Sequence, residues 1–288
     1  MAPCHAVYFY GGCRFTILNR LTVRIEKVKK QMIPILSSEE LERYDRQIMI
    51  DEIGVAGQEK LKKANVLICG AGGLGSPAAI YLAAAGVGSL TLIDHDRVAL
   101  SNLNRQILHG DADIGRRKVD SAKEKLGKLN SHLMLQTATV RITDENAVEW
   151  VAGHDVIIDA LDNLATRYAL NKAAQEMRVA FIHGAVNGFE GRALTVIPGQ
   201  SACLRCLHRG AAPETGKFPV IGVTPAIIGV IQATEAIKYL TGIGELLAGR
   251  LVVYDGLKAK WSEFKVKKNP ECDHCGRPPE RKTPWVSR

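Results

Sequence analysis

The feature that most constrains the fold of this chain is a glycine-rich turn placed between a strand and a helix. The apolar run 64–69 predicts a buried strand that ends at the motif Gly70-x-Gly-Gly-x-Gly75. The small residues of 76–86 predict a closely packed helix, and 89–94 predicts a second strand. Glycines let the backbone approach a phosphate, and a helix N-terminus attracts the anion. The unit therefore predicts a Rossmann-like nucleotide-binding turn, with a turn that binds no ligand as the open alternative.

Helical and strand patterns alternate through the rest of the chain. The predicted helices are 39–50, 58–63, 115–130, 144–152, 166–177 and 224–240. The further predicted strands are 133–140, 155–160, 179–185, 192–197, 250–254 and 261–267. Such alternation predicts an α/β fold with a mostly parallel sheet that continues into a mixed sheet. We expect one domain over residues 37–276, an N-terminal extension over 1–36 and a C-terminal tail over 277–288.

Composition and charge exclude several classes of protein. The 288 residues are 46% hydrophobic and 24% charged, as in globular proteins rather than disordered or fibrous ones. The net charge is +8, but residues 1–31 hold six Lys/Arg against one Glu, so we expect no nucleic-acid partner. The longest apolar stretch, 218–231, is shorter than the roughly 20 residues of a membrane span. We expect a cytoplasmic protein whose cysteines are thiols or metal ligands.

Polar and basic residues follow the second predicted strand. Asp94 lies 24 residues after Gly70, near the spacing of an acid that binds ribose hydroxyls. After it come the candidate phosphate-binding residues, which are Ser101, Asn102, Leu103, Asn104, Arg105 and Lys118. An enzyme acting at the α-phosphate of ATP needs such fixed cations and amides, because charge develops on the phosphates and on departing pyrophosphate. An NAD-dependent dehydrogenase has no general need for them. A solvated surface is the alternative for each cation taken alone.

A pair of polar residues follows the predicted strand 155–160. Asp162 and Asn163 come where the carboxyl end of a parallel strand would place ligands. A carboxylate there suits Mg²⁺ bound to nucleotide phosphates. The alternative is that Asp162 caps the next helix.

Two Cys-x-x-Cys pairs, Cys203/Cys206 and Cys272/Cys275, supply four thiolates. Four thiolates form a closed tetrahedral zinc site, which is structural because it leaves no open position for chemistry. A redox Cys-x-x-Cys is the rival interpretation. It is disfavoured by the expectation that neither pair opens a helix after a strand.

In this order and spacing the motifs resemble the MoeB/ThiF/HesA family, the bacterial relatives of ubiquitin-activating enzymes. The resemblance runs from about Glu39 to Gly276. The matching segments are 43–47, 70–75, 94–96, 101–106, Lys118, 162–163, Gly191, 229–239 and both cysteine pairs.

The resemblance implies an adenylyltransferase. Such enzymes use ATP and Mg²⁺ to adenylate the C-terminal glycine of a small ubiquitin-like sulfur-carrier protein (MoaD/ThiS-like, ending in Gly-Gly). Pyrophosphate is released, and the pathways are molybdopterin, thiamin or related sulfur-transfer biosynthesis. A tRNA-modifying dehydratase of the same superfamily, an NAD-dependent oxidoreductase and an inactive zinc-holding scaffold remain alternatives.

The resemblance also implies roles for particular residues, several of which the motifs alone leave open. Gly73 would contact ATP, Asp94 the ribose and Asp162 the Mg²⁺, and the phosphates would be held by Asn102, Arg105 and Lys118. Arg46, which by itself reads as part of a charged helix, would reach the ATP of the other subunit in a homodimer. Some relatives carry a thioester-forming cysteine in a crossover loop. This chain has no cysteine between Cys206 and Cys272, so we expect adenylation without a covalent loop thiol.

Overall fold

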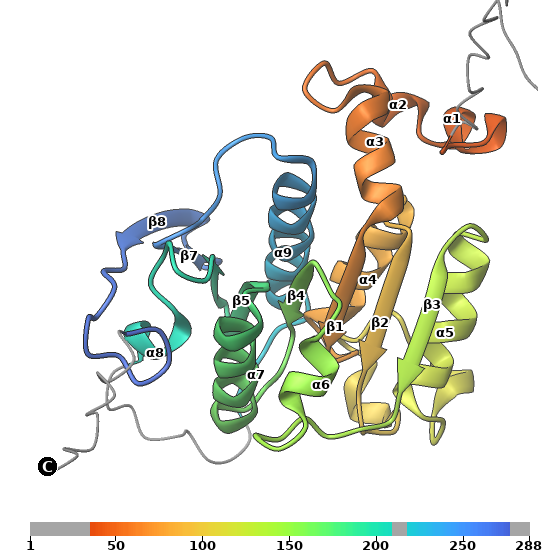
Figure 1. Cartoon of the computed structure of the whole chain (residues 1–288). Helices are drawn as coiled ribbons and strands as arrows, with labels where there is room; N and C mark the ends of the chain where they lie inside the picture. The colour runs from red at the N-terminus through yellow and green to blue at the C-terminus, as the bar shows by residue number, and fades with distance from the viewer. Residues whose placement is uncertain (1–34, 209–217, 277–288) are drawn as a thin grey trace, which may run out of the picture. The chain divides into compact units, whose positions relative to one another are not determined.

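An eight-stranded sheet forms the centre of the computed structural model, which describes residues 35–208 and 218–276 of the unit Ile35–Arg288 (Figure 1). The strand order is β3-β2-β1-β4-β5-β6-β7-β8. The strands are β1 (Asn65–Cys69), β2 (Ser89–Ile93), β3 (Met134–Ala138), β4 (Val156–Asp159), β5 (Ala180–Asn187), β6 (Glu190–Val196), β7 (Arg250–Asp255) and β8 (Lys260–Lys265).

The sheet changes from parallel to antiparallel at β5. Strands β3, β2, β1, β4 and β5 run parallel, and β5 to β8 pair antiparallel. The residues of β2 and β4 are buried throughout, as expected for parallel strands covered on both faces. The outer strand β8 is exposed along most of its length. The predicted mixed sheet is therefore confirmed.

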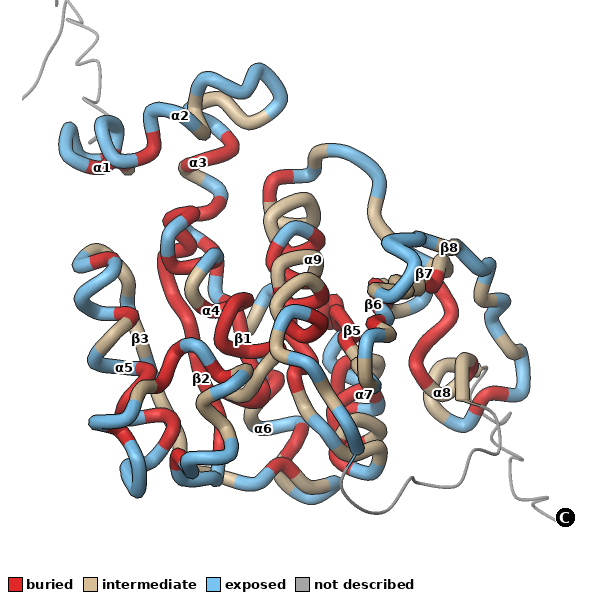
Figure 2. The backbone as a smooth tube through the Cα atoms, turned by 180° about the vertical axis from the view of Figure 1, so that it is seen from behind, coloured by how far each residue is buried: buried red, intermediate tan, exposed pale blue. Residues whose placement is uncertain are grey.

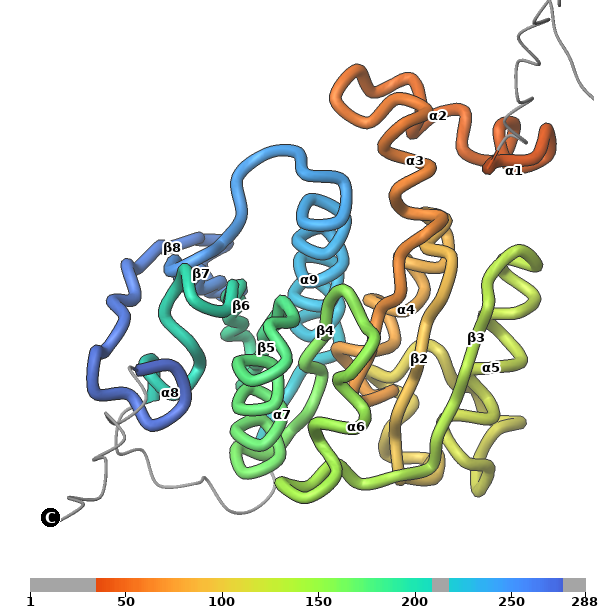
Figure 3. Tube along the Cα trace, viewed as in Figure 1, coloured from red at the N-terminus to blue at the C-terminus, as the bar shows by residue number. Residues whose placement is uncertain are grey.

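Helices cover both faces of the sheet (Figures 1 and 3). Those on one face are α4 (Gly75–Ala84), α5 (Lys118–Leu129) and α9 (Val223–Thr241), and those on the other are α6 (Ala147–Val151) and α7 (Leu164–Met177). Each face has its own cluster of buried apolar side chains, one including Leu82 and Ile158 and the other Leu170 and Phe181. Figure 2 shows the central strands as the most buried part of the backbone. No described helix is long and apolar enough to cross a bilayer.

The first predicted helix, 39–50, is divided in the structure into α1 (Ser38–Arg43) and α2 (Asp45–Ile48). Tyr44 leaves the helical conformation between them, and its buried hydroxyl accepts a hydrogen bond from Asn130 Nδ2 at 2.9 Å. This contact with a distant residue overrides local helix propensity. The next helix, α3 (Gly54–Lys63), begins before the predicted 58.

In the glycine turn, the backbone at the start of α4 lies very close to the backbone that follows β1. Gly70 has φ +105°, and a Cβ on Gly75 would lie 1.7 Å from the Gly70 carbonyl oxygen. Only glycine fits such an approach. In α9, a Cβ on Gly229 would lie 2.4 Å from the Leu74 oxygen, so this helix packs directly on the start of α4.

The expected extension 1–36 falls outside the described residues except for its last two, and the tail 277–288 lies wholly outside them. The expected domain boundaries stay a prediction.

Candidate active site

A cavity of about 1100 Å³ opens at the carboxyl ends of the parallel strands. It is lined by the glycine turn, by the segments after β2 and β4, and by residues from β5, β6 and the segment 218–220. Ligands of open α/β sheets bind at this edge. The position agrees with the nucleotide site that the sequence predicts.

The glycine turn contributes backbone to the cavity. Gly70, Gly72, Gly73 and Leu74 line it, and α4 begins at the next residue, Gly75. The N-terminus of this helix is thereby aimed at the cavity, which favours an anion there.

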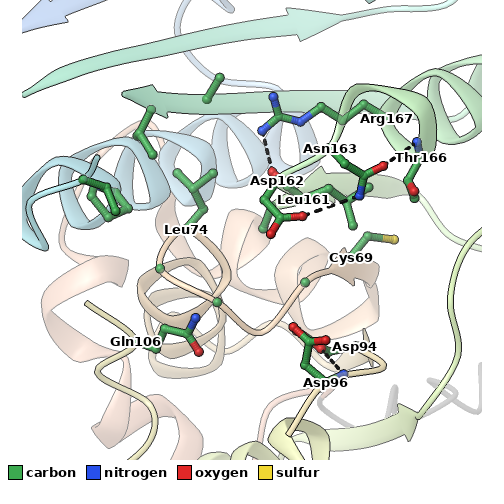
Figure 4. Close-up of a pocket in the computed structure, with 18 of the residues that line it drawn as sticks. Cys69, Leu74, Asp94, Asp96, Gln106, Leu161, Asp162, Asn163, Thr166 and Arg167 are labelled. Atoms are coloured by element: carbon green, nitrogen blue, oxygen red, sulfur yellow. Dashed lines mark hydrogen bonds between the residues drawn. The ribbon is translucent and has the colours of Figure 1, made fainter. Parts of the chain in front are cut away.

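Asp94 follows the last residue of β2 and is held rigidly. One carboxylate oxygen accepts the Ala71 N–H and the other accepts the Asp96 N–H, each at 2.8 Å. In Figure 4, Asp94 and Asp96 lie on the opposite side of the glycine turn from Asp162.

Lys118 begins α5 and is buried, so the solvated-surface alternative is wrong for this residue. Its Nζ lies 2.8 Å from Asp96 Oδ2 and 4.0 Å from Asp94 Oδ2. Partial burial acts to raise the pKa of Asp96, but the hydrogen bond and charge of Lys118 outweigh it and lower that pKa. The lysine is thus fixed at the cavity wall by its ion pair with Asp96.

Arg105 also lines the cavity but is held only by neutral groups. Its Nη1 donates to the Ser101 carbonyl oxygen at 2.8 Å and to Asn104 Oδ1 at 2.9 Å. It forms no ion pair within the part of the chain that the structure describes. Ser101 and Asn102 line the cavity with it, whereas Leu103 and Asn104 do not.

Asp162 and Asn163 line the same cavity but differ in their contacts. Strand β4 ends at Asp159, so Asp162 lies three residues beyond it. Asn163 is the N-cap of α7, since its Oδ1 accepts the Thr166 N–H at 2.9 Å. The alternative that Asp162 caps this helix is therefore wrong. The exposed Asp162 carboxylate is available for a cation.

A buried polar cluster beside Asp162 was missed by the sequence reasoning. His183 Nδ1 donates to Asp159 Oδ2 at 2.6 Å, and Arg167 donates to the carbonyl oxygens of Leu161 and Gly184. Burial, together with the charges of neighbouring groups, lowers the pKa of the nearby His208 to about 4. The position of Arg167 near this site could have been predicted, because it lies four residues after Asn163, at the start of the predicted helix 166–177.

Of the four predicted catalytic residues, only Arg46 lies outside this cavity. It is exposed on α2 and does not line the cavity of its own chain.

The four predicted zinc ligands meet in space. The sulfur atoms of Cys203 and Cys272 are 3.7 Å apart, those of Cys206 and Cys275 3.5 Å, and those of Cys203 and Cys206 4.0 Å. Sulfurs placed about 2.3 Å from a tetrahedral zinc lie about 3.8 Å from one another, and a disulfide needs about 2.05 Å. The four thiols therefore fit a zinc ion.

The expectation that neither cysteine pair opens a helix is wrong for the first pair. Cys203 is the N-cap of the short helix α8 (Leu204–Leu207), so the first pair does open a helix. The redox interpretation is still disfavoured, because the sulfur atoms of both pairs lie together in one four-cysteine cluster. Asn171 ties both pairs to α7, accepting the Leu204 N–H and contacting His274 Nδ1.

Comparison with known proteins agrees with this geometry. The model of the ThiF family matches residues 44–274, most of the chain. The chain belongs to the ThiF family. This ThiF-family chain is 43% identical over 247 residues to a SAMP-activating enzyme E1 of Haloferax volcanii, covering 84% of the chain and 91% of the relative. It is 41% identical over 256 residues to a sulfur carrier protein adenylyltransferase of Thermus thermophilus, covering 85% and 94%.

A longer relative matches in part. The adenylyltransferase and sulfurtransferase MOCS3 of Anopheles gambiae is 39% identical over 277 residues, which are 92% of this chain and 63% of that protein. The predicted enzyme class, adenylyltransferase, is confirmed by these relatives.

Solved structures confirm the fold. A crystal structure of PaaA superposes with a TM-score of 0.70 and 27% identity, covering 82% of this chain and 76% of that one. The structure of Escherichia coli MccB with ATP superposes with a TM-score of 0.74 and 24% identity, covering 82% and 75%.

Proposed function

We propose that this ThiF-family chain uses ATP to adenylate the C-terminal glycine of a small ubiquitin-like sulfur-carrier protein and releases pyrophosphate. The observation that carries the proposal is one cavity that combines a glycine turn at a helix N-terminus with Arg105, Lys118 and Asp162. Relatives over most of the chain are named for the same chemistry.

Each group at the cavity has a role in this proposal. The turn at Gly73 binds the phosphates, Asp94 the ribose, and Asn102, Arg105 and Lys118 the phosphate oxygens. Asp162 holds Mg²⁺, which supplies positive charge to the phosphates when it is bound. The carboxylate of Asp162 fits that ion because, among the described residues, its only hydrogen bond is a long one from Asn163 Nδ2 at 3.5 Å.

The reaction needs no base from the protein. The carboxylate of a C-terminal glycine is already ionised near neutral pH and can attack the α-phosphate directly. The residues of the cavity align the reactants and stabilise the charge on departing pyrophosphate. Alignment contributes up to about 7–11 kcal/mol in favourable cases, and one well-placed electrostatic group about 3 kcal/mol.

Zinc and a second subunit complete the proposal. Zinc at the four cysteines joins α8 to the segment 272–275 and is structural, since four thiolates leave no open position. In a homodimer, exposed Arg46 of each chain contacts the ATP phosphates of the other. A guanidinium suits that task because it binds phosphate in a bidentate way.

Pyrophosphate–ATP exchange with and without a carrier ending in Gly-Gly tests the proposal. We expect Arg105→Ala and Asp162→Ala each to lower the carrier-dependent exchange rate by about 100-fold or more at unchanged melting temperature. Arg97→Ala is the matched control, because Arg97 is exposed and its guanidinium, among the described residues, bonds only to the Gly115 carbonyl oxygen, at 2.7 Å and outside the cavity. Near-normal exchange in either variant would remove that residue from the mechanism.

A further inference from the structure

A buried histidine connects three segments of the candidate active site. His109 lies beyond Arg105 and Gln106 and is 6% exposed. Its Nε2 is 3.0 Å from the carbonyl oxygen of Ala71 in the glycine turn. Its Nδ1 is 2.9 Å from Ser121 Oγ, one turn along α5 from Lys118.

The two contacts determine which ring nitrogen carries the proton. The Ala71 carbonyl oxygen can only accept, so Nε2 must donate, and Nδ1 then accepts from the Ser121 hydroxyl. Burial lowers the pKa of His109, and the charges of Lys125 and Lys118 lower it further, against the opposing effects of the Ala71 bond and Asp113. The ring is therefore neutral near pH 7.

The bond from His109 fixes a peptide group that faces the cavity. Because the peptide between Ala71 and Gly72 is planar and trans, the Gly72 N–H points opposite to the Ala71 carbonyl, away from His109. The preceding peptide is held separately, since the Ala71 N–H donates to Asp94 Oδ2 at 2.8 Å. Gly72 lines the cavity. A peptide followed by glycine rotates easily, so an outside contact is needed to select one orientation.

We propose that His109 is a positioning residue for nucleotide binding, which holds the Ala71–Gly72 peptide so that the Gly72 N–H faces the nucleotide phosphates. Without the bond, the peptide can turn its carbonyl oxygen toward the phosphates, where like partial charges repel. The inference rests on the proposed function only in taking ATP as the nucleotide.

Two amide substitutions separate the contacts of His109. The Nε2 of glutamine reaches about where the histidine Nε2 lies, so His109→Gln keeps a donor for Ala71. The amide of asparagine reaches only the Nδ1 position, so His109→Asn keeps a group near Ser121 and loses the bond to Ala71. Both variants are neutral, polar and unable to titrate, which makes them a matched pair.

The test is calorimetric binding of Mg-ATP to the full chain without any carrier. We expect His109→Asn to weaken ATP binding by about tenfold, and His109→Gln to remain within about threefold of wild type. In exchange assays the KM for ATP should rise in His109→Asn, with kcat at saturating ATP and the KM for the carrier unchanged. Equal ATP affinity in the two variants, or a change only in the carrier's KM, would overturn the role of His109.

Nuclear magnetic resonance on the wild-type chain gives a second test that needs no variant to fold. The ¹⁵N shifts should show His109 protonated at Nε2, and the Gly72 amide proton should move downfield when ATP binds. A ring protonated at Nδ1, or an unmoved Gly72 amide, would refute the inference. By contrast, a wild-type chain that binds ATP but adenylates no carrier would refute the proposed function and leave the role of His109 standing.

Discussion

Single cationic side chains around the cavity differ in how much of their charge is available to a ligand. Lys118 is buried and paired with Asp96 and Asp94, so part of its charge is already compensated. Arg105 bonds only to neutral oxygens of the described chain, and its charge is available to a phosphate. We therefore expect more of the charge of Arg105 than of Lys118 to be available to the phosphates of a nucleotide.

One buried carboxylate, Asp113, contributes to the pH dependence of stability. Asp113 accepts from the Gly110 N–H at 2.9 Å and Arg116 Nη1 at 2.8 Å, and it also pairs with Lys125. Burial acts to raise its pKa, but these partners lower the pKa strongly. A lowered pKa stabilises the fold above the unfolded-state value of about 3.9, and that stabilisation is lost as the pH falls below it.

We expect Asp113→Asn to lower the melting temperature at pH 7 by several degrees, since about 1–3 kcal/mol is lost with such contacts. The difference from wild type should shrink between pH 4 and pH 3. Thermal unfolding across this range is the measurement, and Asp111→Asn, an exposed aspartate of the same turn, is the control. A constant difference down to pH 3 would contradict the lowered pKa.

At the scale of elements, the packing of α9 on α4 holds the glycine turn in place. Gly229 lies where the two helices meet, and a Cβ there would also come within 2.6 Å of Pro77 Cγ. Gly127 of α5 is the matched control, because a Cβ at that position would meet nothing within 4 Å.

We expect Gly229→Ala to lower the free energy of unfolding by about 1–3 kcal/mol despite the better helix propensity of alanine, because the helices must separate. Gly127→Ala should raise the same free energy by up to about 1 kcal/mol. Urea unfolding of both variants measures the effects. Equal gains in stability would show that α9 and α4 are not in close contact.

The cysteine cluster joins two elements that are far apart in the sequence. We expect about one zinc per chain in protein purified without chelator, and far less in Cys275→Ala, together with a lower melting temperature, because metal binding contributes to folding. Cys69→Ala should keep its zinc, since this buried thiol lies in β1 outside the cluster. Elemental analysis measures the zinc content of each protein, and a metal-free wild type would refute the zinc site.

At the scale of the whole molecule, the position of Arg46 bears on how many chains make an active site. The cavity of one chain does not include this residue, which lies exposed on α2. A two-fold dimer is the commonest oligomer and would allow each subunit to lend Arg46 to the other.

Mixing two inactive variants tests this arrangement. In a mixed dimer of Arg46→Ala and Asp162→Ala, one site keeps both wild-type residues and the other loses both. If subunits exchange freely between dimers, the rate of pyrophosphate–ATP exchange should return to about one quarter of the wild-type value per site. If mass spectrometry shows that subunits have exchanged and the mixture still stays inactive, Arg46 does not act across an interface.

Local patterns in the sequence were enough to predict the strands, the glycine turn and the motif residues. Strand 64–69 and the turn after it are encoded by neighbouring residues, since an apolar run and glycines act over a few positions. The Ser37 cap of α1, whose hydroxyl accepts the Glu40 N–H, is a contact of the same short range.

The tertiary structure alone decided which side chains meet. Lys118 is buried against Asp96, and His109 reaches Ala71. These two pairs are 22 and 38 residues apart along the chain, and the cysteine pairs 69. Such contacts depend on how strands and helices pack, which residue spacing does not encode, whereas the identities of the groups needed to bind a nucleotide were already present in the sequence.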